Sequence, residues 1–498
     1  MEKKALILFL ICIFSVVVFA SQSGGEVVAI PQAYDLRNVD GNCYITPVKS
    51  QCVPHQPWNC VGLCWAFSSL ASFESSLLKQ GIASDPYSPE ANLSPWHLGC
   101  HIGFNHPNYE FNDTLVGDPP VPISYQLDST MQFGWGGSAL FTIDFLSSGR
   151  GLVLEVDAPL PLERMETREV LLPPDRDLPA HYMLRKGLVY AREDFDGDRE
   201  YMNTIKRAVM EYGALASPMY LGAPDLPGQS GMSFWRDDGY SDYYCDLEEL
   251  TNQLVHLVTI AGWDDMKRID GAPGDGAWLI KDSLGRQLHD GGYFWISYYD
   301  TVFLKGDSYA VSLVADRNEG YADSRYRSSE HTLSFPIGGS SMYESDGSYE
   351  GNRSSSFCVS FISLEDGLLK SVGLIAANRN EHVVLKVFES WDDELCEPSG
   401  EVLSEDFILE ERGYHLIDLA RPVEVFEGQE FVIVVSFRFN PDAQGGPLVY
   451  VTDEDGSSIM AKTFLASFSD DLDRPLWTDY REIRENSAFF LQAIMQDE

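Results

Sequence analysis

The chain has few positive charges for its size and, after its first twenty residues, no long apolar run. Its 498 residues include 35 lysines and arginines against 76 aspartates and glutamates, a formal net charge of -41. Such a surface repels nucleic acid and anionic lipid, so we expect no nucleic-acid partner. No later stretch supplies the roughly 20 apolar residues that a membrane-spanning helix needs, so we also expect no transmembrane segment.

Metal-binding patterns are lacking as well. The nine cysteines include no Cys-x-x-Cys pair with a matching partner pair, so we expect no metal and no cofactor. Alternating aspartates at residues 194–198 suggest a calcium loop, but the glycine is misplaced and Ile205 stands where a bidentate Glu is required. A solvated turn and helix cap is the favoured interpretation of that segment.

The first twenty residues have the features of a secretory signal peptide. Lys3 and Lys4 precede an apolar run that ends in Val-Phe-Ala at Ala20, and this run is too short to span a membrane. We therefore expect cleavage near Ala20 and a secreted, extracellular protein. Export permits disulfides. Removal of Cys12 and a free Cys64 would leave seven cysteines, an odd number whose pairing the sequence does not fix.

One stretch, GLCWAFS at residues 62–68, suggests chemistry. A helical pattern follows it to about Gln80 and places Cys64 at a helix N-terminus. Unpaired N–H groups and the helix dipole at that end lower the pKa of a thiol and make it nucleophilic. On these seven residues alone, a buried structural cysteine remains the alternative.

Further elements follow from apolar periodicity. Residues 151–190 are proline-rich and are expected to be irregular. Helices are expected near 139–147 and 199–212, and apolar strands at 255–263, 277–285 and 292–298. His256 lies in the first of these strands and Asp282 in the second, at places where the two side chains could meet.

The last third of the chain has a different pattern. Residues 315–355 are rich in Ser, Gly, Tyr and Glu, as in a linker or a ragged sheet edge. Short strands with intervening turn residues predict an all-β sandwich or jelly roll beyond that point. They are expected at 357–362, 369–376, 383–388, 415–419, 431–437, 448–451 and 489–494.

Taken in order, these motifs resemble the papain-like cysteine proteases. They are most similar to a secreted bacterial and archaeal branch whose protease precedes a C-terminal lectin-like β domain. The matching stretches are YDLR at 34–37, PVKSQ at 47–51, CWAFS at 64–68, LS at 93–94, GG at 136–137, the strand from 256 to 265, WLIKDS at 278–283 and GY at 292–293.

The resemblance implies an α+β class with a papain-like two-lobed fold, a helical lobe plus a β-barrel-like lobe. It places the protease domain at 30–314, the linker at 315–355 and a lectin-like β-sandwich at 356–498. It also implies catalytic roles for Cys64, His256, Asp282 and Gln51, and substrate-binding roles for Gly136 and Gly137. The thiol would attack the scissile carbonyl, and the imidazole would later protonate the leaving amine.

Departures from the family pattern surround these residues. The orienting residue is Asp282 instead of the usual Asn, and Leu284 replaces the Trp that normally covers the His–Asn contact. An ionised Asp282 stabilises an imidazolium but can hold its proton too tightly for donation. The loop between Gln51 and Cys64 is also longer than usual, which makes Gln56 a rival for the oxyanion role.

The resulting hypothesis is a secreted papain-like cysteine endopeptidase that hydrolyses peptide bonds in protein or peptide substrates. Two alternatives remain: a catalytically impaired homologue that acts as an exported binding or adhesion protein, and a transglutaminase-like acyltransferase. The lectin-like resemblance suggests a carbohydrate or cell-surface ligand for the C-terminal domain. A plain structural sandwich fits the same strand pattern.

Overall fold

The computed structural model describes the chain from residue 29 onward, with gaps. The described residues are 29–54, 56, 59–101, 137–147, 149, 151–167, 171, 174–175, 178–222, 231–247, 254–305, 309–317, 345–346, 355–438, 448–452, 462–467, 475–479, 482, 487–489 and 491–496. The expected signal peptide lies outside them. Met1–Pro31 and Gln32–Glu498 form separate units, and every described helix and strand belongs to the second.

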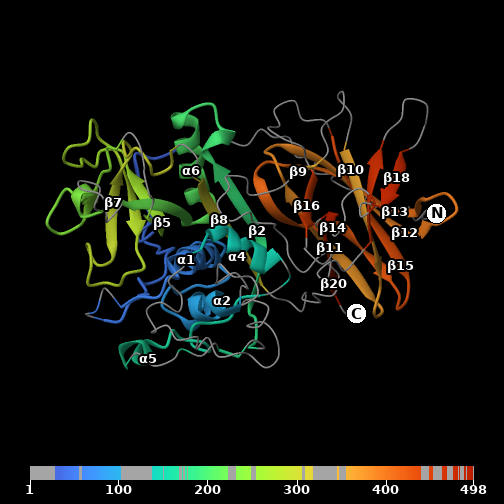
Figure 1. Cartoon of the computed structure of the whole chain (residues 1–498), viewed down its shortest axis with the longest axis horizontal. Coiled ribbons are helices and arrows are strands. Elements are labelled where there is room, and N and C mark those ends of the chain that lie inside the picture. Colours follow the sequence, from blue (N-terminus) through green and yellow to red (C-terminus); the bar gives the residue numbers. More distant parts are fainter. Residues whose placement is uncertain are drawn as a thin grey trace, which may run out of the picture. The chain divides into compact units, whose positions relative to one another are not determined.

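The helices whose bounds are described all lie in the first half of the chain (Figure 1). The α-helices are α1 (Cys64–Lys79), α2 (Pro95–His101), α4 (Ala139–Ser147), α5 (Leu162–Thr167) and α6 (Asp198–Tyr212). The 3₁₀ helices are η1 (Pro89–Ala91), η2 (Arg192–Asp194) and η3 (Gly231–Phe234). Within the described part of the chain, no helix is both long and apolar enough to cross a bilayer.

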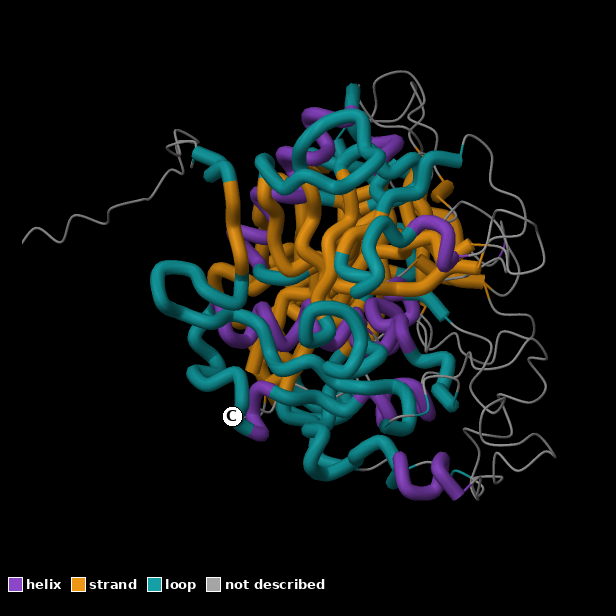
Figure 2. The backbone as a smooth tube through the Cα atoms, turned by 90° about the vertical axis from the view of Figure 1, so that its left-hand side faces the viewer, coloured by secondary structure: helices purple, strands orange, loops and turns teal. Residues whose placement is uncertain are grey.

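Strands supply most of the regular structure (Figure 2), and the largest sheet contains eleven of them. In spatial order they are β20 (Gln492–Gln496), β11 (Gly367–Ala376), β14 (Arg412–Val425), β2 (Tyr182–Ala191), β8 (Tyr309–Arg317), β3 (Leu215–Gly222), β5 (Leu254–Asp264), β6 (Ala277–Lys281), β7 (Tyr293–Ser297) and β4 (Asp242–Tyr243), with β1 (Ala33–Asp35) paired to β5. The sheet therefore joins three strands from beyond residue 355 to strands from the first 317 residues.

A second sheet faces the β20–β11–β14 end of the first across a shared core. Its order is β13 (Glu397–Leu409), β12 (Glu381–Asp392), β15 (Glu430–Phe437), β10 (Ser355–Ile362), β17 (Lys462–Ser467) and β18 (Leu476–Asp479). Val359 and Ile433 of this sheet belong to one hydrophobic cluster with Leu369 and Val372 of β11. A small sheet of β19 (Ser487–Phe489), β16 (Leu448–Thr452) and β9 (Ser345–Asp346) completes the predicted sandwich.

Helix α1 is buried on all sides, and its small polar residues make this possible. Trp65 and Phe73 are fully buried in the hydrophobic core. On the face toward β8, the hydroxyls of Ser72 and Ser76 accept hydrogen bonds from strand N–H groups at 3.1 and 3.0 Å. Serine is short enough to let helix and strand backbones approach closely, and it satisfies donors that burial would otherwise leave unpaired.

The prediction of irregular structure at 151–190 was wrong, since this stretch contains α5 and β2, and strands β3, β8, β13, β17 and β18 were not predicted. Residues 182–190, expected to be irregular, form most of β2, a strand in the interior of the large sheet. Both faces of β2 are covered, so its burial lacks the alternation that marks a half-exposed strand. Strand β13 was missed because it lies at a sheet edge, paired only with β12, and carries many charged residues.

Candidate active site

Cys64 is the first residue of α1 and is buried, with 8% of its surface exposed. One turn later, the hydroxyl of Ser68 donates a hydrogen bond of 2.6 Å to the carbonyl of Val258 in β5. This bond fixes the start of α1 against the strand that carries His256. A hydrogen bond joins the Cys64 side chain to the His256 ring.

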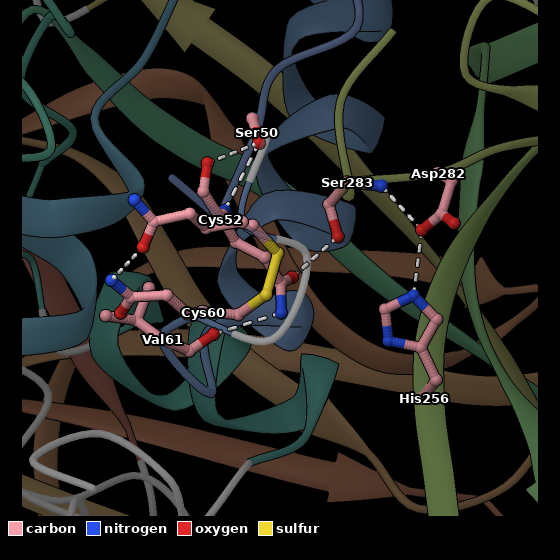
Figure 3. Close-up of a disulfide and its surroundings, with 10 residues drawn as sticks. Ser50, Cys52, Cys60, Val61, His256, Asp282 and Ser283 are labelled. Carbon is pink, nitrogen blue, oxygen red and sulfur yellow. Dashed lines mark hydrogen bonds and ion pairs between the residues drawn. A yellow bond between two sulfur atoms is a disulfide. The ribbon is translucent and has the colours of Figure 1, made fainter. Parts of the chain in front are cut away.

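The His256 ring lies between the thiol and Asp282. Its Nε2 is 2.8 Å from Oδ1 of Asp282, as Figure 3 shows. This contact leaves Nδ1 as the ring nitrogen available to Cys64. The register of β5 and β6 brings the two residues together, because Thr259 lies opposite Lys281 and Asp282 directly follows it.

Burial and charge act in opposite directions on this pair. Burial raises the pKa of the Cys64 thiol, but the hydrogen bond and charge of His256, together with backbone hydrogen bonds from Leu257 and Trp65, outweigh it, so the pKa is lowered overall. Burial lowers the pKa of His256, yet the charge and hydrogen bond of Asp282 raise it to about 10. Burial would raise the pKa of Asp282, but mainly the positive charge of His256 holds it well below its usual range. The balance favours thiolate beside imidazolium.

Asp282 has further partners that sequence reasoning missed. Its Oδ1 accepts a hydrogen bond of 2.6 Å from the N–H of Ser283. Its Oδ2 lies 2.9 Å from Nε2 of His289, whose Nδ1 lies 2.6 Å from the carbonyl oxygen of Tyr240. The indole of Trp235 stacks on the His289 ring at 4.9 Å between centroids.

The sequence held one clue to these partners. Leu284 stands where the family has a Trp, so the His256–Asp282 contact lacks its usual aromatic cover. Another aromatic residue was therefore to be expected beside it. His289 supplies an aromatic neighbour to Asp282, and Trp235, from another segment, stacks on His289. No local motif links these positions, so the pattern alone could not identify them.

Gln51 is hydrogen-bonded to Ser283, the residue that follows Asp282 in the chain. Its side-chain Nε2 donates to the carbonyl of Val61 at 3.0 Å, and its Oε1 accepts a hydrogen bond of 2.7 Å from the Ser283 hydroxyl. The long loop after Gln51 closes on itself, because a Cys52–Cys60 disulfide joins its ends and the Val61 N–H bonds back to the Gln51 carbonyl at 3.1 Å. Figure 3 shows this disulfide near Ser283.

The other predicted residues lie as follows. Gln56 is within the closed loop, where its Oε1 accepts a hydrogen bond of 3.2 Å from Asn59. Gly137 lies against Trp65, so that an added Cβ would be 2.5 Å from the indole Nε1, which leaves room only for glycine. Gly136 lies outside the described residues, and its substrate-binding role stays a prediction.

Metal ligands do not gather in the described part of the chain. No group of three or more His, Cys, Asp or Glu residues there could hold a metal ion. In the suspected calcium loop, Asp198 instead forms ion pairs with Arg192 at 2.9 Å and Lys305 at 2.5 Å. The described cysteines outside the disulfide are free, namely Cys43, Cys64, Cys100, Cys245, Cys358 and Cys396.

Comparison with known proteins supports the same architecture. A family model described as a lectin-like domain matches residues 343–494. The solved structure of the clostridial cysteine protease Cwp84 after propeptide cleavage is 18% identical, with a TM-score of 0.64, covering 94% of this chain and 99% of that chain.

A second solved structure contains the cysteine protease and lectin-like domains of Cwp84, a surface layer associated protein of Clostridium difficile. It is 19% identical, with a TM-score of 0.63, covering 94% of this chain and 89% of that one. No curated protein matches the chain by sequence. The α+β fold, a papain-like protease fold joined to a lectin-like β domain, is thereby confirmed.

Proposed function

We propose that this chain is a secreted cysteine endopeptidase. The observation that carries the proposal is the buried array of Cys64, His256 and Asp282, in which the pKa of the thiol is lowered and that of the imidazole is raised. A thiolate is the form of cysteine that attacks a carbonyl carbon, and an imidazolium is the form of histidine that protonates a leaving amine.

The reaction follows from these positions. The Cys64 thiolate attacks the scissile carbonyl, and His256 gives its Nδ1 proton to the amine as the C–N bond breaks. His256 then takes a proton from water, which attacks the thioester and releases the acid product and the thiol. We assign stabilisation of the intermediate oxyanion to the Gln51 side-chain N–H and the Cys64 backbone N–H.

The structure favours this proposal over an impaired binding protein. Decay of an active site would leave buried ionisable groups without partners, which costs stability. Here Asp282 has three hydrogen-bond partners, and His256 is bonded on both sides. The papain-like fold of the solved neighbours likewise gives no support to a transglutaminase-like acyltransferase.

We place the protein outside the cell on the basis of its first twenty residues and its disulfide, which persists best in an oxidising compartment. The lectin-like part is proposed to bind a carbohydrate or cell-surface ligand. A hollow lined by Phe388, Glu389, Arg421 and the exposed Phe426 offers apolar and charged contacts for it. The surface layer association of Cwp84 suggests a similar setting.

The direct test is a fluorogenic peptide assay on the full chain. Replacing the nucleophile in Cys64→Ala is expected to lower kcat/KM by about 10⁴-fold or more. Cys396→Ala is the matched control, because Cys396 is an exposed free cysteine in the C-terminal part, and it should keep wild-type activity. Cleavage by Cys64→Ala at the wild-type rate, or no iodoacetamide-sensitive cleavage by the wild type at any pH, would overturn the proposal.

A further inference from the structure

One buried ionisable residue next to the array takes no part in the reaction itself. His289 has only 6% of its side chain exposed, and both of its ring nitrogens have partners. Nε2 lies 2.9 Å from Oδ2 of Asp282, and Nδ1 lies 2.6 Å from the carbonyl oxygen of Tyr240. The nature of these two partners determines where the protons lie.

A carbonyl oxygen can only accept a hydrogen bond, so Nδ1 of His289 carries a proton. Two states of the Nε2–Oδ2 contact then remain. Either Nε2–H donates to an ionised Asp282 and His289 is an imidazolium, or Asp282 is protonated on Oδ2 and donates to a neutral His289. Without a proton between them, two acceptors would face each other at 2.9 Å, which is repulsive.

Both states have the same net charge. Imidazolium with carboxylate sums to zero, and imidazole with carboxylic acid also sums to zero. In both, Oδ1 of Asp282 remains an acceptor for the Ser283 N–H and for Nε2–H of His256. The Asp282–His289 pair thus offers His256 an oxygen acceptor on a neutral unit, as the amide of the usual Asn does.

The surroundings of His289 hold it in this position. Trp235 stacks on its ring with 27° between the planes, and Phe294 contacts it at 4.8 Å between centroids. A stacked indole also stabilises a cation. His289 and Tyr240 both have left-handed backbone conformations, with φ of 56° and 54°. Such conformations are strained for residues other than glycine and persist where the surrounding structure requires them, often at functional sites.

The charged groups in the turns around the Asp282–His289 pair have other partners or are exposed. Asp237, in the same turn as Tyr240, accepts hydrogen bonds from the N–H groups of Gly239, Ser241 and Asp242. Asp290, the next residue after His289, is exposed. Phe294 and Trp235 are uncharged, so the contacts described around the His289 ring include one ionised partner, Asp282.

We infer that His289 is a positioning residue that neutralises Asp282 and thereby lets an aspartate do the work of the usual asparagine. With the carboxylate compensated, His256 is held in the correct orientation without an excess negative charge that would retain its proton. The inference rests on the proposed peptidase function, in which His256 must give up that proton to the leaving amine. It explains how Asp282 is compatible with catalysis.

The test uses the full chain and measures two properties against pH. One is the rate at which iodoacetamide alkylates Cys64, followed on the peptide that contains it by mass spectrometry. This rate changes at the pH where the ion pair forms and again at the pH where His256 loses its proton. The second change, called here the second step, therefore reports on the proton of His256 without any peptide cleavage. The other is kcat and KM for the fluorogenic peptide. The variants are His289→Leu, His289→Gln, Asp282→Asn and His289→Leu combined with Asp282→Asn.

In His289→Leu, the second change in alkylation rate should occur at a pH about one unit or more higher than in the wild type. The reason is that the negative charge of Asp282 is then uncompensated and keeps the proton on His256. The same variant should lower kcat about tenfold with little change in KM. His289→Gln should behave similarly, since its amide can donate a hydrogen bond to Asp282 but carries no positive charge to compensate the carboxylate. In the double variant, Asp282→Asn removes the excess charge, so both readouts should return to the values of Asp282→Asn alone.

Other results would overturn the inference. A wild-type profile in His289→Gln, an unmoved step in His289→Leu, or a double variant as impaired as His289→Leu would each mean that His289 only fills space. The matched control is His181→Leu, which removes a half-exposed histidine 3.9 Å from Asp157 and should change neither readout. If the wild type alkylates through a low-pKa thiolate but cleaves no peptide, the peptidase proposal fails, while the alkylation step still decides the role of His289.

Discussion

Burial alone would make Cys64 a poor nucleophile. Withdrawal from water raises the pKa of the thiol and lowers that of His256, because each charged form loses hydration. The thiolate and the imidazolium offset this cost for each other, and Asp282, itself paired with His289, accepts a hydrogen bond from the imidazolium. The ion pair therefore depends on both Cys64 and His256, and removal of either leaves the other uncompensated.

This balance predicts a bell-shaped dependence of kcat/KM on pH. The lowered pKa of Cys64 keeps the thiolate at pH values below the usual range of a thiol, so the acid limb should lie on the acidic side of that range. The raised pKa of His256 keeps the imidazolium until about pH 10, so activity should fall as pH rises through that value. The measurement is kcat/KM for the fluorogenic peptide from pH 4 to 11. A rate that only begins to rise near pH 8–9, where a free cysteine ionises, would contradict the ion pair.

Among the elements, the closed loop between Gln51 and Cys64 shows how an insertion leaves a site intact. The Cys52–Cys60 disulfide joins the base of the loop, and the Val61 N–H bonds to the Gln51 carbonyl at 3.1 Å. The chain thus returns to Gln51 three residues before the nucleophile, and the residues between are looped out. The longer spacing in sequence is therefore not a longer distance across the site.

The loop geometry predicts which glutamine serves the oxyanion. Gln51→Ala should lower kcat about 10²–10³-fold with little change in KM, because an oxyanion donor acts mainly in the transition state. Gln56 hydrogen-bonds within the loop, and Gln56→Ala is the matched control that should stay near wild type. Both are measured by steady-state kinetics on the same peptide. Greater impairment of Gln56→Ala would transfer the role to Gln56.

The sequence predicted those elements whose pattern of apolar residues lies within the element itself, and it failed where distant parts of the chain determine the burial. Helix α4 was predicted at its observed bounds, and α6 within one residue, because apolar periodicity and the glycine after α6 are local. Strand β2 could not be recognised, since its regular pattern is erased by burial on both faces. Its neighbours in the sheet, β8 and β14, come from more than 100 residues further along the chain.

The candidate site divides in the same way. His256 and Asp282 were predicted to meet because they lie on successive strands, and the structure places them 2.8 Å apart. His289 and Trp235 could not be predicted, because their positions depend on two turns with left-handed residues instead of on a strand register. A site built on paired strands can thus be inferred from spacing, whereas one assembled by loops cannot.

At the scale of the whole molecule, the pairing of β2 with β14 makes the protease part and the lectin-like part share one sheet. Ile375, Tyr414 and Ile494 from the C-terminal part lie in the same hydrophobic cluster as Val189 of β2. Arg185 on β2 also forms an ion pair with Asp418 on β14. These contacts give the C-terminal strands a structural role in addition to any ligand they bind.

A buried histidine makes this junction sensitive to acid. His415 on β14 lies opposite Lys186 on β2, and its Nε2–H donates to the carbonyl of Glu411 at 2.8 Å. Burial, with a smaller effect from the charge of Lys186, lowers the pKa of His415 to about 4. The folded protein therefore keeps His415 neutral at pH values where an unfolded chain, with an ordinary histidine pKa near 6.5, binds a proton.

The sign of the linkage follows from this difference. As pH falls from about 6.5 to about 4, the unfolded state gains a proton that the folded state does not, so the free energy of unfolding should decrease by about 3 kcal/mol.

His415→Gln keeps a donor for the Glu411 carbonyl but cannot titrate, and its unfolding free energy should fall less steeply over the same interval. Urea unfolding at pH 7, 6, 5 and 4.5 measures both slopes, and their difference isolates His415 from other titrating groups. His382→Gln, at a half-exposed histidine of the lectin-like part that pairs with Asp406, is the control substitution. Equal slopes for His415→Gln and wild type would mean that His415 takes up its proton without leaving the folded sheet, and that the junction of β2 with β14 does not weaken in acid.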